Sequence, residues 1–417
     1  MTRTLIRGGE VLDVRRGVAE RADVLIEGDL IADVSTRSIE IENADIVDAD
    51  GMTLIPGLID CHAHINTAAM TAHPPVPESL AAAYASRELH EMLMRGFTTV
   101  RDVAGADGGH REAVERGLFI GPRLFVCGDA LTQTGGHGDS RGPGDLREQR
   151  RTGSVVVDGA DNVRRAVREN LRRGADHIKL MVSGGIASPT DPLESIQFTE
   201  AEIRAATEEA ANAGKYVAAH AYSDEAVHRA VSWGVRTIEH GSLIQERAAK
   251  TMAAEGAFLV PTLSPYYWVM TRGQELGLPA FHIEKARLPF EASAAALALA
   301  RDCGVRVAYG SDLFKTPHEQ QAYEFILRSP VEAPLDAIRS ATLVGAEVVG
   351  LEGKIGELTP GAFADILAVD GNPLHDLMLL QDQGARVPLI IKAGRQVKND
   401  LLRFGRTERP AVSSAAS

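Results

Sequence analysis

The middle of the chain repeats one pattern, in which an amphipathic helical stretch ends at a glycine and a short apolar run follows within about two residues. Glycine in that place is typical of the left-handed residue that ends a helix. Two further apolar runs, at 54–62 and 124–128, bring the number of predicted buried strands to eight. The runs that follow glycines are 97–100, 177–180, 216–219, 235–238, 257–260 and 305–308.

Eight buried strands alternating with helices predict an α/β fold, a (β/α)8 TIM barrel. The alternative is an open doubly wound sheet, but no glycine-rich dinucleotide fingerprint follows the first strand. Helices are predicted at 161–173 and at 199–213, where Thr199 and Glu202 have the spacing of a capping box. The stretch 131–160 is rich in Gly, Arg and Asp, and we expect a functional loop there.

Short strand-like segments lie at both ends of the chain. The runs 23–27 and 30–34 flank Gly28-Asp29, which is typical of a two-residue hairpin, and further strand-like runs follow residue 363. Chain termini often lie close together, so we expect a small β-sandwich formed by 1–55 and 355–405, with the barrel over 56–354. The small, polar segment 406–417 is predicted to be a flexible tail.

Histidines and one aspartate stand where the predicted strands end. His62 and His64 form a His-x-His, and alternation along a strand points both toward the barrel mouth. His220 ends the fifth strand, His240 the sixth and Asp312 the eighth, and active-site groups belong at these ends of a barrel. Each alone is explained by a hydrogen-bonded buried group or a loop histidine, whereas all five together favour a divalent metal site.

Lys179 lies in the middle of the apolar run 178–182. A buried ammonium without a partner costs several kcal/mol, so one interpretation is a structural ion pair. The other is a desolvated, neutral and reactive amine. Reaction of that amine with carbon dioxide would give a carbamate, a two-oxygen ligand able to bridge two metals.

Four motifs resemble the amidohydrolase superfamily: PGLIDCHAH at 56–64, TTVRD at 98–102, IEHG at 238–241, and the closing GELxxGxxAD at 356–365. The resemblance covers nearly the whole chain. It implies a binuclear metal hydrolase in which a hydroxide shared by the metals attacks the substrate and Asp312 serves as general base and acid. The ligands that it implies are His62, His64 and Asp312 for the first metal, His220 and His240 for the second, and carboxylated Lys179 as the bridge.

Three segments narrow the resemblance to the Xaa-Pro dipeptidase and carboxypeptidase-like branch, which is close to imidazolonepropionase and to the ochratoxin-hydrolysing amidases. They are 183–192, HAY at 220–222 and QTGGHG at 133–138. The branch implies cleavage of an amide beside a free carboxylate, as in Xaa-Pro dipeptides or N-acyl amino acids. His137 would face the substrate and Tyr222 would donate to its carbonyl or carboxylate; otherwise they are loop-stabilising and rim residues.

Two alternatives remain beside this function. A cyclic-amide hydrolase similar to imidazolonepropionase is the alternative among enzymes, although the lysine argues against it. A metal-binding scaffold protein is the non-enzyme alternative, which the complete ligand set disfavours. The other histidines, His177 and His282 among them, are interpreted as solvated or packing residues, and Arg101 as structural or carboxylate-binding.

The composition of the 417-residue chain limits the classes of partner that it could bind. Its net charge of -13 argues against general nucleic-acid binding and leaves an anionic substrate to be met by local donors. No apolar window approaches the ~18 residues of a membrane helix. The three cysteines form no CxxC pair, which is typical of reduced thiols in a cytoplasmic protein. A small-molecule substrate is expected, zinc suits the ligands best, and the resemblance implies a homo-oligomer.

Overall fold

The computed structural model describes residues 2–71, 76–142, 144–146, 153–314 and 318–404. The chain divides into two compact units. One contains Met1–Ile59, Glu91–Thr99 and Ala333–Ser417, and the other contains Asp60–His90 and Val100–Glu332. The boundaries at 56 and 354 stay a prediction, and the segment 406–417 lies outside the described residues.

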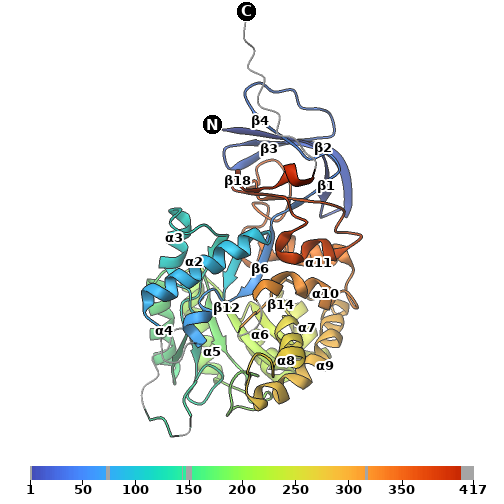
Figure 1. Cartoon of the computed structure of the whole chain (residues 1–417). Helices are drawn as coiled ribbons and strands as arrows, with labels where there is room; N and C mark the ends of the chain where they lie inside the picture. Colours follow the sequence, from blue (N-terminus) through green and yellow to red (C-terminus); the bar gives the residue numbers. More distant parts are fainter. Residues whose placement is uncertain (1, 72–75, 143, 147–152, 315–317, 405–417) are drawn as a thin grey trace, which may run out of the picture. The chain divides into compact units, whose positions relative to one another are not determined.

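The strands from the two ends of the chain form one sheet of eight strands, ordered β18-β17-β16-β5-β1-β2-β3 with β4 beside β1. In Figure 1 the blue first strands and β18, near the red end of the chain, lie in the same part of the structure. The expected hairpin is confirmed, because Glu27 pairs with Leu30 across Gly28-Asp29. Packing of this sheet as a two-layer sandwich stays a prediction. The strands are β1 (Arg3–Asp13), β2 (Val18–Glu27), β3 (Leu30–Ser35), β4 (Asp45–Asp48), β5 (Thr53–Pro56), β16 (Ile366–Val369), β17 (Leu389–Lys392) and β18 (Arg395–Asn399).

The predicted first barrel strand, 54–62, is two strands. β5 belongs to the sheet of the chain ends, where it pairs with β16, and β6 begins only at Leu58. The break falls at Gly57, where a Cβ would lie 2.1 Å from Oγ1 of Thr98. Only glycine allows this approach, so the apolar run could not continue as one strand.

The other strands form a seven-stranded sheet, β10-β9-β11-β12-β13-β14-β15, and a three-stranded sheet, β6-β7-β8. Strands β9 to β15 pair in parallel, as expected for strands joined by helical crossovers. Backbone hydrogen bonds also join Cys61 to Tyr309 and Asp176 to Val126. The α/β arrangement is consistent with a TIM-barrel-like fold. The strands are β6 (Leu58–Ala63), β7 (Phe97–Asp102), β8 (Arg123–Phe125), β9 (Ala130–Thr132), β10 (Ser154–Val156), β11 (Ile178–Met181), β12 (Val217–Ser223), β13 (Thr237–Leu243), β14 (Phe258–Val260) and β15 (Arg306–Val307).

Helices alternate with these strands and lie around them in Figure 1. A buried apolar cluster that includes Val167, Ile203, Ile238 and Leu297 fills the space between helices and strands. The longer helices are α2 (Glu78–Met94), α3 (Gly108–Glu115), α4 (Ala160–Arg172), α5 (Glu200–Asn212), α6 (Asp224–Ser232), α7 (Glu246–Ala254), α8 (Ser264–Arg272) and α9 (Ala280–Asp302). The shorter ones are α1 (Thr67–Thr71), α10 (Glu324–Arg328), α11 (Pro334–Ser340), α12 (Leu343–Val348) and the 3₁₀ turns η1 (His318–Tyr323), η2 (Leu377–Leu380), η3 (Asp382–Gly384) and η4 (Leu401–Phe404).

The stretch 131–160 is more regular than expected. It contains β10, which pairs with β9, and β9 in turn pairs with β11 at Leu131 and Leu180. Short strands of three residues carry too little periodicity to be recognised in a sequence. Residues 143 and 147–152 of this stretch lie outside the described part.

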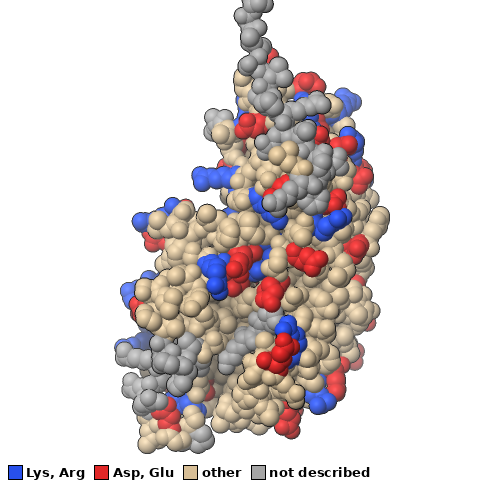
Figure 2. All heavy atoms as spheres, in the orientation of Figure 1, with Lys and Arg blue, Asp and Glu red and all other residues tan. Residues whose placement is uncertain are grey.

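Charged side chains of both signs are scattered over the face seen in Figure 2. Elsewhere in the chain, charged side chains form ion pairs along one helix, as Lys250 does with Glu246, or between two helices, as Arg168 does with Glu209. Among the described residues, no helix combines the length and the apolar character needed to cross a bilayer.

The capping box of α5 is confirmed and holds a second helix as well. The backbone N of Thr199 donates to Oε2 of Glu202 over 2.7 Å. Oε1 of the same carboxylate accepts the backbone N of Gly159, the residue that precedes α4, over 2.6 Å. One side chain therefore fixes the starts of α4 and α5.

Replacing Glu202 with Ala is expected to lower the free energy of unfolding by about 1 kcal/mol, because two helix starts lose their carboxylate acceptor. The shift of a urea unfolding midpoint measures it. The matched control is Glu208→Ala on the same helix, where the carboxylate pairs only with Arg164 at the surface. The control should change stability by less than about 0.5 kcal/mol. Equal shifts in both variants would rule out the double capping role.

Candidate active site

The carboxyl ends of the parallel strands bring the predicted ligands to one cavity of about 330 Å³. His62 stands on β6, Lys179 on β11, His220 on β12 and His240 on β13, and all four are at most 5% exposed. His64 and Asp312 line the same cavity. The sequence prediction that these six residues lie together therefore agrees with the structure, while their roles stay predictions.

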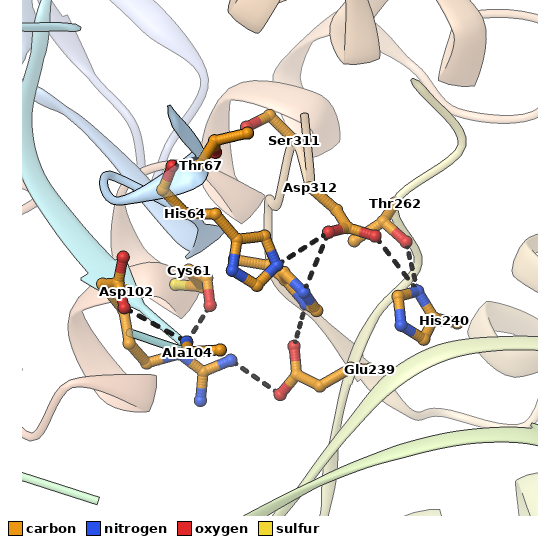
Figure 3. Close-up of polar contacts among 12 residues, drawn as sticks. Cys61, His64, Thr67, Asp102, Ala104, Glu239, His240, Thr262, Ser311 and Asp312 are labelled. Carbon is orange, nitrogen blue, oxygen red and sulfur yellow. Dashed lines mark hydrogen bonds and ion pairs between the residues drawn. The ribbon is translucent and has the colours of Figure 1, made fainter. Parts of the chain in front are cut away.

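Asp312 is the centre of the cluster. Its Oδ1 lies 3.3 Å from Nε2 of His62 and 3.1 Å from Nε2 of His64, and its Oδ2 lies 3.8 Å from Nδ1 of His240. Figure 3 shows this carboxylate between the rings of His64 and His240. Ligand atoms of His62, His240 and Asp312 all lie within 4.8 Å of one another, so one divalent ion could contact all three.

Glu239 orients His62. Its Oε2 lies 2.7 Å from Nδ1 of His62, and its Oε1 accepts hydrogen bonds from Nη2 of Arg101 and from Oγ1 of Thr237, each over 2.7 Å. Arg101 and Glu239 are fully buried. Nδ1 of His62 faces this carboxylate, so Nε2 is the ring nitrogen that faces Asp312 and could bind a metal.

Two other imidazoles also have one ring nitrogen in a hydrogen bond. Nε2 of His220 donates to the carbonyl of Gly184 over 3.0 Å, which leaves a lone pair on Nδ1. In His240 the nitrogen that faces Asp312, Nδ1, also lies 2.7 Å from Oγ1 of Thr262. The buried Nδ1 of His64 has no hydrogen-bond partner among the described residues. These donors fit a divalent metal.

Burial sets the charge of the site. It lowers the pKa of His220 and of His240 well below the ordinary value, so both rings are neutral, the form that binds metals. Burial would raise the pKa of Asp312, but the neighbouring His62 and His64 hold it well below its usual range. Burial also opposes protonation of His62, yet Asp312 and Glu239 leave its pKa raised.

Lys179 is buried among these groups. Burial lowers the pKa of its amine, against the attraction of Glu239. The lysine makes no hydrogen bond or ion pair with a described residue, so the structural ion pair considered from the sequence is not present in that part of the chain. Its lowered pKa favours the neutral amine.

His137 and Tyr222 also line the cavity. The ring of His137 stacks on that of His220, with centroids 4.2 Å apart, and Tyr222 stacks on His240 at 5.2 Å. Burial lowers the pKa of His137 to about 4. Burial, and then the neighbouring Tyr266, raises the pKa of Tyr222 well above its usual value, so its hydroxyl keeps the proton.

Sequence reasoning missed several residues of the cavity. His282 of α9 lines it, although it was interpreted as a solvated or packing residue. Its sequence neighbourhood is an ordinary helix, which contains no signal for a site. In the structure Arg101 forms an ion pair with Glu239. The sequence signal for this pair was the presence of two opposite charges inside apolar strands. Further lining residues are Met70, Ala104, Ser140, Ser154, Met181, Ile186, Ser188, Pro265, Val269 and Phe314.

Backbone strain concentrates at the strand ends of the site. His240 has φ 78°, Asp312 has φ 45° and Thr262 has φ 47°, all in the left-handed region that favours glycine. Such conformations cost about 1–3 kcal/mol each and cluster at functional sites. Here they aim two candidate ligands and the hydroxyl that contacts one of them.

Residues 53–397 match the family model described as the amidohydrolase family. The chain belongs to the amidohydrolase family. The family resemblance identified in the motifs is thereby confirmed, and the protein is a hydrolase acting on amide bonds.

Similar proteins agree with this assignment. Ochratoxinase from Aspergillus niger is 31% identical over 371 residues, which cover 83% of this chain and 75% of that protein. A prolidase crystallised with N-methylphosphonate-L-proline superposes with a TM-score of 0.92 at 45% identity, over 95% of this chain and 100% of that one. A Xaa-Pro dipeptidase with bound methionine superposes with a TM-score of 0.87 at 30% identity, over the same shares.

Replacing Glu239 with Gln should weaken metal binding about 10–100-fold. An amide has one acceptor oxygen and cannot receive hydrogen bonds from both Arg101 and His62. Metal affinity is measured by competition with a chelator, together with the melting temperature, which should fall as well. The control is Glu246→Gln, which changes an exposed carboxylate of α7 that pairs with Lys250. Unchanged metal affinity in Glu239→Gln would show that this carboxylate does not orient a ligand.

Proposed function

We propose that the protein is a binuclear metal-dependent amidohydrolase that cleaves an amide bond beside a free carboxylate, as in Xaa-Pro dipeptides or N-acyl amino acids, including ochratoxin-like amides. The observation that carries the proposal is a cavity lined by four buried histidines, the partly buried Asp312 and a buried lysine that has no hydrogen bond or ion pair with a described residue. The similarity to a prolidase, a Xaa-Pro dipeptidase and an ochratoxinase supports this substrate class.

The proposed metal ligands are those of the motif resemblance. His62, His64 and Asp312 would hold one ion, and His220 and His240 a second. Zinc suits this set of nitrogen and carboxylate donors best. When bound, the two ions supply Lewis acidity toward a carbonyl oxygen and lower the pKa of water.

Lys179 is proposed to carry a carbamate that bridges the two ions. Its neutral amine forms a bond to the carbon of carbon dioxide and releases one proton. The product is an anion with two oxygen donors. This reaction replaces a buried amine, whose charged form has no ion pair with a described residue, with an anion that the surrounding ions and donors can satisfy.

Asp312 is the proposed proton carrier. Asp312 lines the cavity with its carboxylate against His62 and His64, so it would take a proton from the attacking water and pass it to the leaving nitrogen. Tyr222, with a hydroxyl that stays protonated, would donate to the substrate carbonyl oxygen as negative charge develops there. His137 is the other residue that the motif resemblance places beside the substrate, where it was expected to help stabilise the charge on this oxygen.

The cavity lining suits a small apolar amide with a free carboxylate. Methionine, isoleucine, valine and phenylalanine side chains supply the apolar wall, and Ser140, Ser154 and His282 are polar groups able to meet a carboxylate. Local donors are needed because the net charge of -13 repels an anion.

The remaining expectations belong with this proposal. They are a closed (β/α)8 barrel over 56–354, a β-sandwich from 1–55 and 355–405, a homo-oligomer and a cytoplasmic location. Among the described residues, Cys61, Cys127 and Cys303 form no disulfide, in keeping with a reducing compartment. A cyclic-amide hydrolase stays the enzyme alternative, because it would use a similar metal site on a lactam.

Lys179→Ala should remove the bridge, leave at most one tightly bound metal and abolish nearly all amidase activity. Metal content per chain and turnover are measured together, and short-chain carboxylic acids should restore part of the rate by supplying a substitute bridge. The control, Lys250→Ala, removes an exposed lysine that pairs with Glu246. Two tightly bound metals with normal turnover in Lys179→Ala would exclude the carbamate.

A substrate panel on metal-quantified protein tests the proposed function. It contains Xaa-Pro dipeptides, N-acyl amino acids with hydrophobic C-terminal residues, their C-terminal amides and a cyclic lactam. The free acids should be cleaved, and amidation should lower kcat/KM by at least ~10²-fold, because buried donors would lose their partner. Equal rates for acid and amide, or turnover of the lactam alone, would reject the substrate class. Metal binding without any turnover would favour the scaffold alternative.

A further inference from the structure

The ring of His137 is held from several sides by the segment that follows β11. A Cβ on Gly185 would lie 2.1 Å from Cε1 of His137, so the imidazole packs directly on that glycine. The opposite contact is the stacked ring of His220, 15° from parallel. The backbone N of His137 donates to Oε1 of Gln197 over 3.0 Å. The ring therefore has little freedom to turn.

A chain of polar groups leads from the Nδ1 edge of this ring into the protein. Nδ1 lies 2.8 Å from Oγ of Ser188, and that hydroxyl also donates to Oδ1 of Asp191. Ser188 and Asp191 are buried. The other groups on the Asp191 carboxylate are also donors: Nε2 of Gln197 lies 3.1 Å from Oδ2, and Nζ of Lys285 lies 3.6 Å from Oδ1. A carboxylate surrounded by donors can only accept.

This arrangement decides which nitrogen of His137 carries the proton. Ser188 has one hydroxyl proton, and the carboxylate of Asp191 takes it. Toward His137 the serine can therefore only accept, so Nδ1 must be the donor. In the neutral ring the lone pair is then on Nε2. Nε2 has no hydrogen-bond partner among the described residues, and the residue lines the cavity.

We infer that Ser188 and Asp191 are positioning residues that keep the proton on Nδ1 of His137, so that the ring meets the substrate with an accepting Nε2. The inference rests on the proposed amide hydrolysis and refines it. Tyr222 is then the donor to the carbonyl oxygen, while His137 accepts a hydrogen bond from an N–H group of the substrate. The segment 183–192, which also contacts His220 through the carbonyl of Gly184, thereby acquires a second role.

Nitrogen NMR of the zinc-loaded full chain with ¹⁵N-labelled histidine tests the tautomer directly. Protonated and unprotonated imidazole nitrogens have well-separated shifts, and His137→Gln identifies the signals of this ring among the 13 histidines. The wild type should have the proton on Nδ1. Ser188→Ala should lose this fixed tautomer. A wild-type ring with its proton on Nε2 would overturn the inference.

Steady-state kinetics of two Ser188 variants distinguish a residue that positions His137 from one that only stabilises the loop. Ser188→Ala should lower kcat/KM about 10–100-fold, the usual effect of removing a group that orients another. Ser188→Thr, which keeps the hydroxyl, should recover most of the loss. Lys285→Gln is the structural control, because Nζ of Lys285 holds the same segment through the carbonyls of Ser188 and Asp191. This variant should keep the proton on Nδ1.

Further outcomes are equally decisive. Glu194→Gln changes an exposed carboxylate two residues after the segment 183–192, and it should alter neither the nitrogen shifts of His137 nor kcat/KM. If Ser188→Ala does not fold, the spectra of Asp191→Asn and of the wild type still test which nitrogen of His137 carries the proton. Wild-type shifts and rates in Ser188→Ala would overturn the inference. The shifts are recorded without substrate, so a chain with the Nδ1 tautomer but no amidase activity would reject only the proposed function.

Discussion

The buried ion pair between Arg101 and Glu239 is the constraint on which the site depends. A carboxylate without solvent contact costs several kcal/mol unless it is paired, and Arg101 supplies the pairing. The second oxygen of Glu239 is thereby free to fix His62. That fixed ring faces Asp312 and helps to hold the pKa of the aspartate low. Strands β7, β13 and β6 thus contribute to one electrostatic unit before any substrate is present.

The sequence predicted the parts of this site that depend on strand ends. His62, His220 and His240 could be found because a buried strand that ends in histidine has few structural explanations, and the parallel strands bring such ends together. Lys179 could be found because an ammonium inside an apolar run conflicts with burial. Arg101 and Glu239 stand out in the sequence as charges inside apolar strands, but their pairing could not be found, because a contact between two distant strands leaves no local pattern.

The failures have physical causes of the same kind. The apolar run 54–62 reads as one strand, and only the approach of Thr98 to Gly57 divides it between two sheets. The contact of Ser188 with His137 joins residues 51 positions apart, within segments that have no periodicity. Local propensity describes how a segment folds, whereas these features depend on which segments meet. Prediction from the sequence therefore succeeded for most elements and for the side chains that meet in the cavity, and it failed for the groups that orient them.

The strained backbone at Asp312 needs an anchor, and Asp60 of β6 provides it. The Asp60 carboxylate accepts the backbone N of Ser311 over 3.1 Å, the Ser311 hydroxyl over 2.6 Å and Nε2 of Gln321 over 2.9 Å. The backbone N of Asp312 donates to the carbonyl of His62. Strand β6 thus presents His62 and also holds the segment that carries the opposing carboxylate. Because His62 and Asp60 share β6, the backbone itself fixes the distance between His62 and Asp312, and the cluster that could hold a metal is preformed.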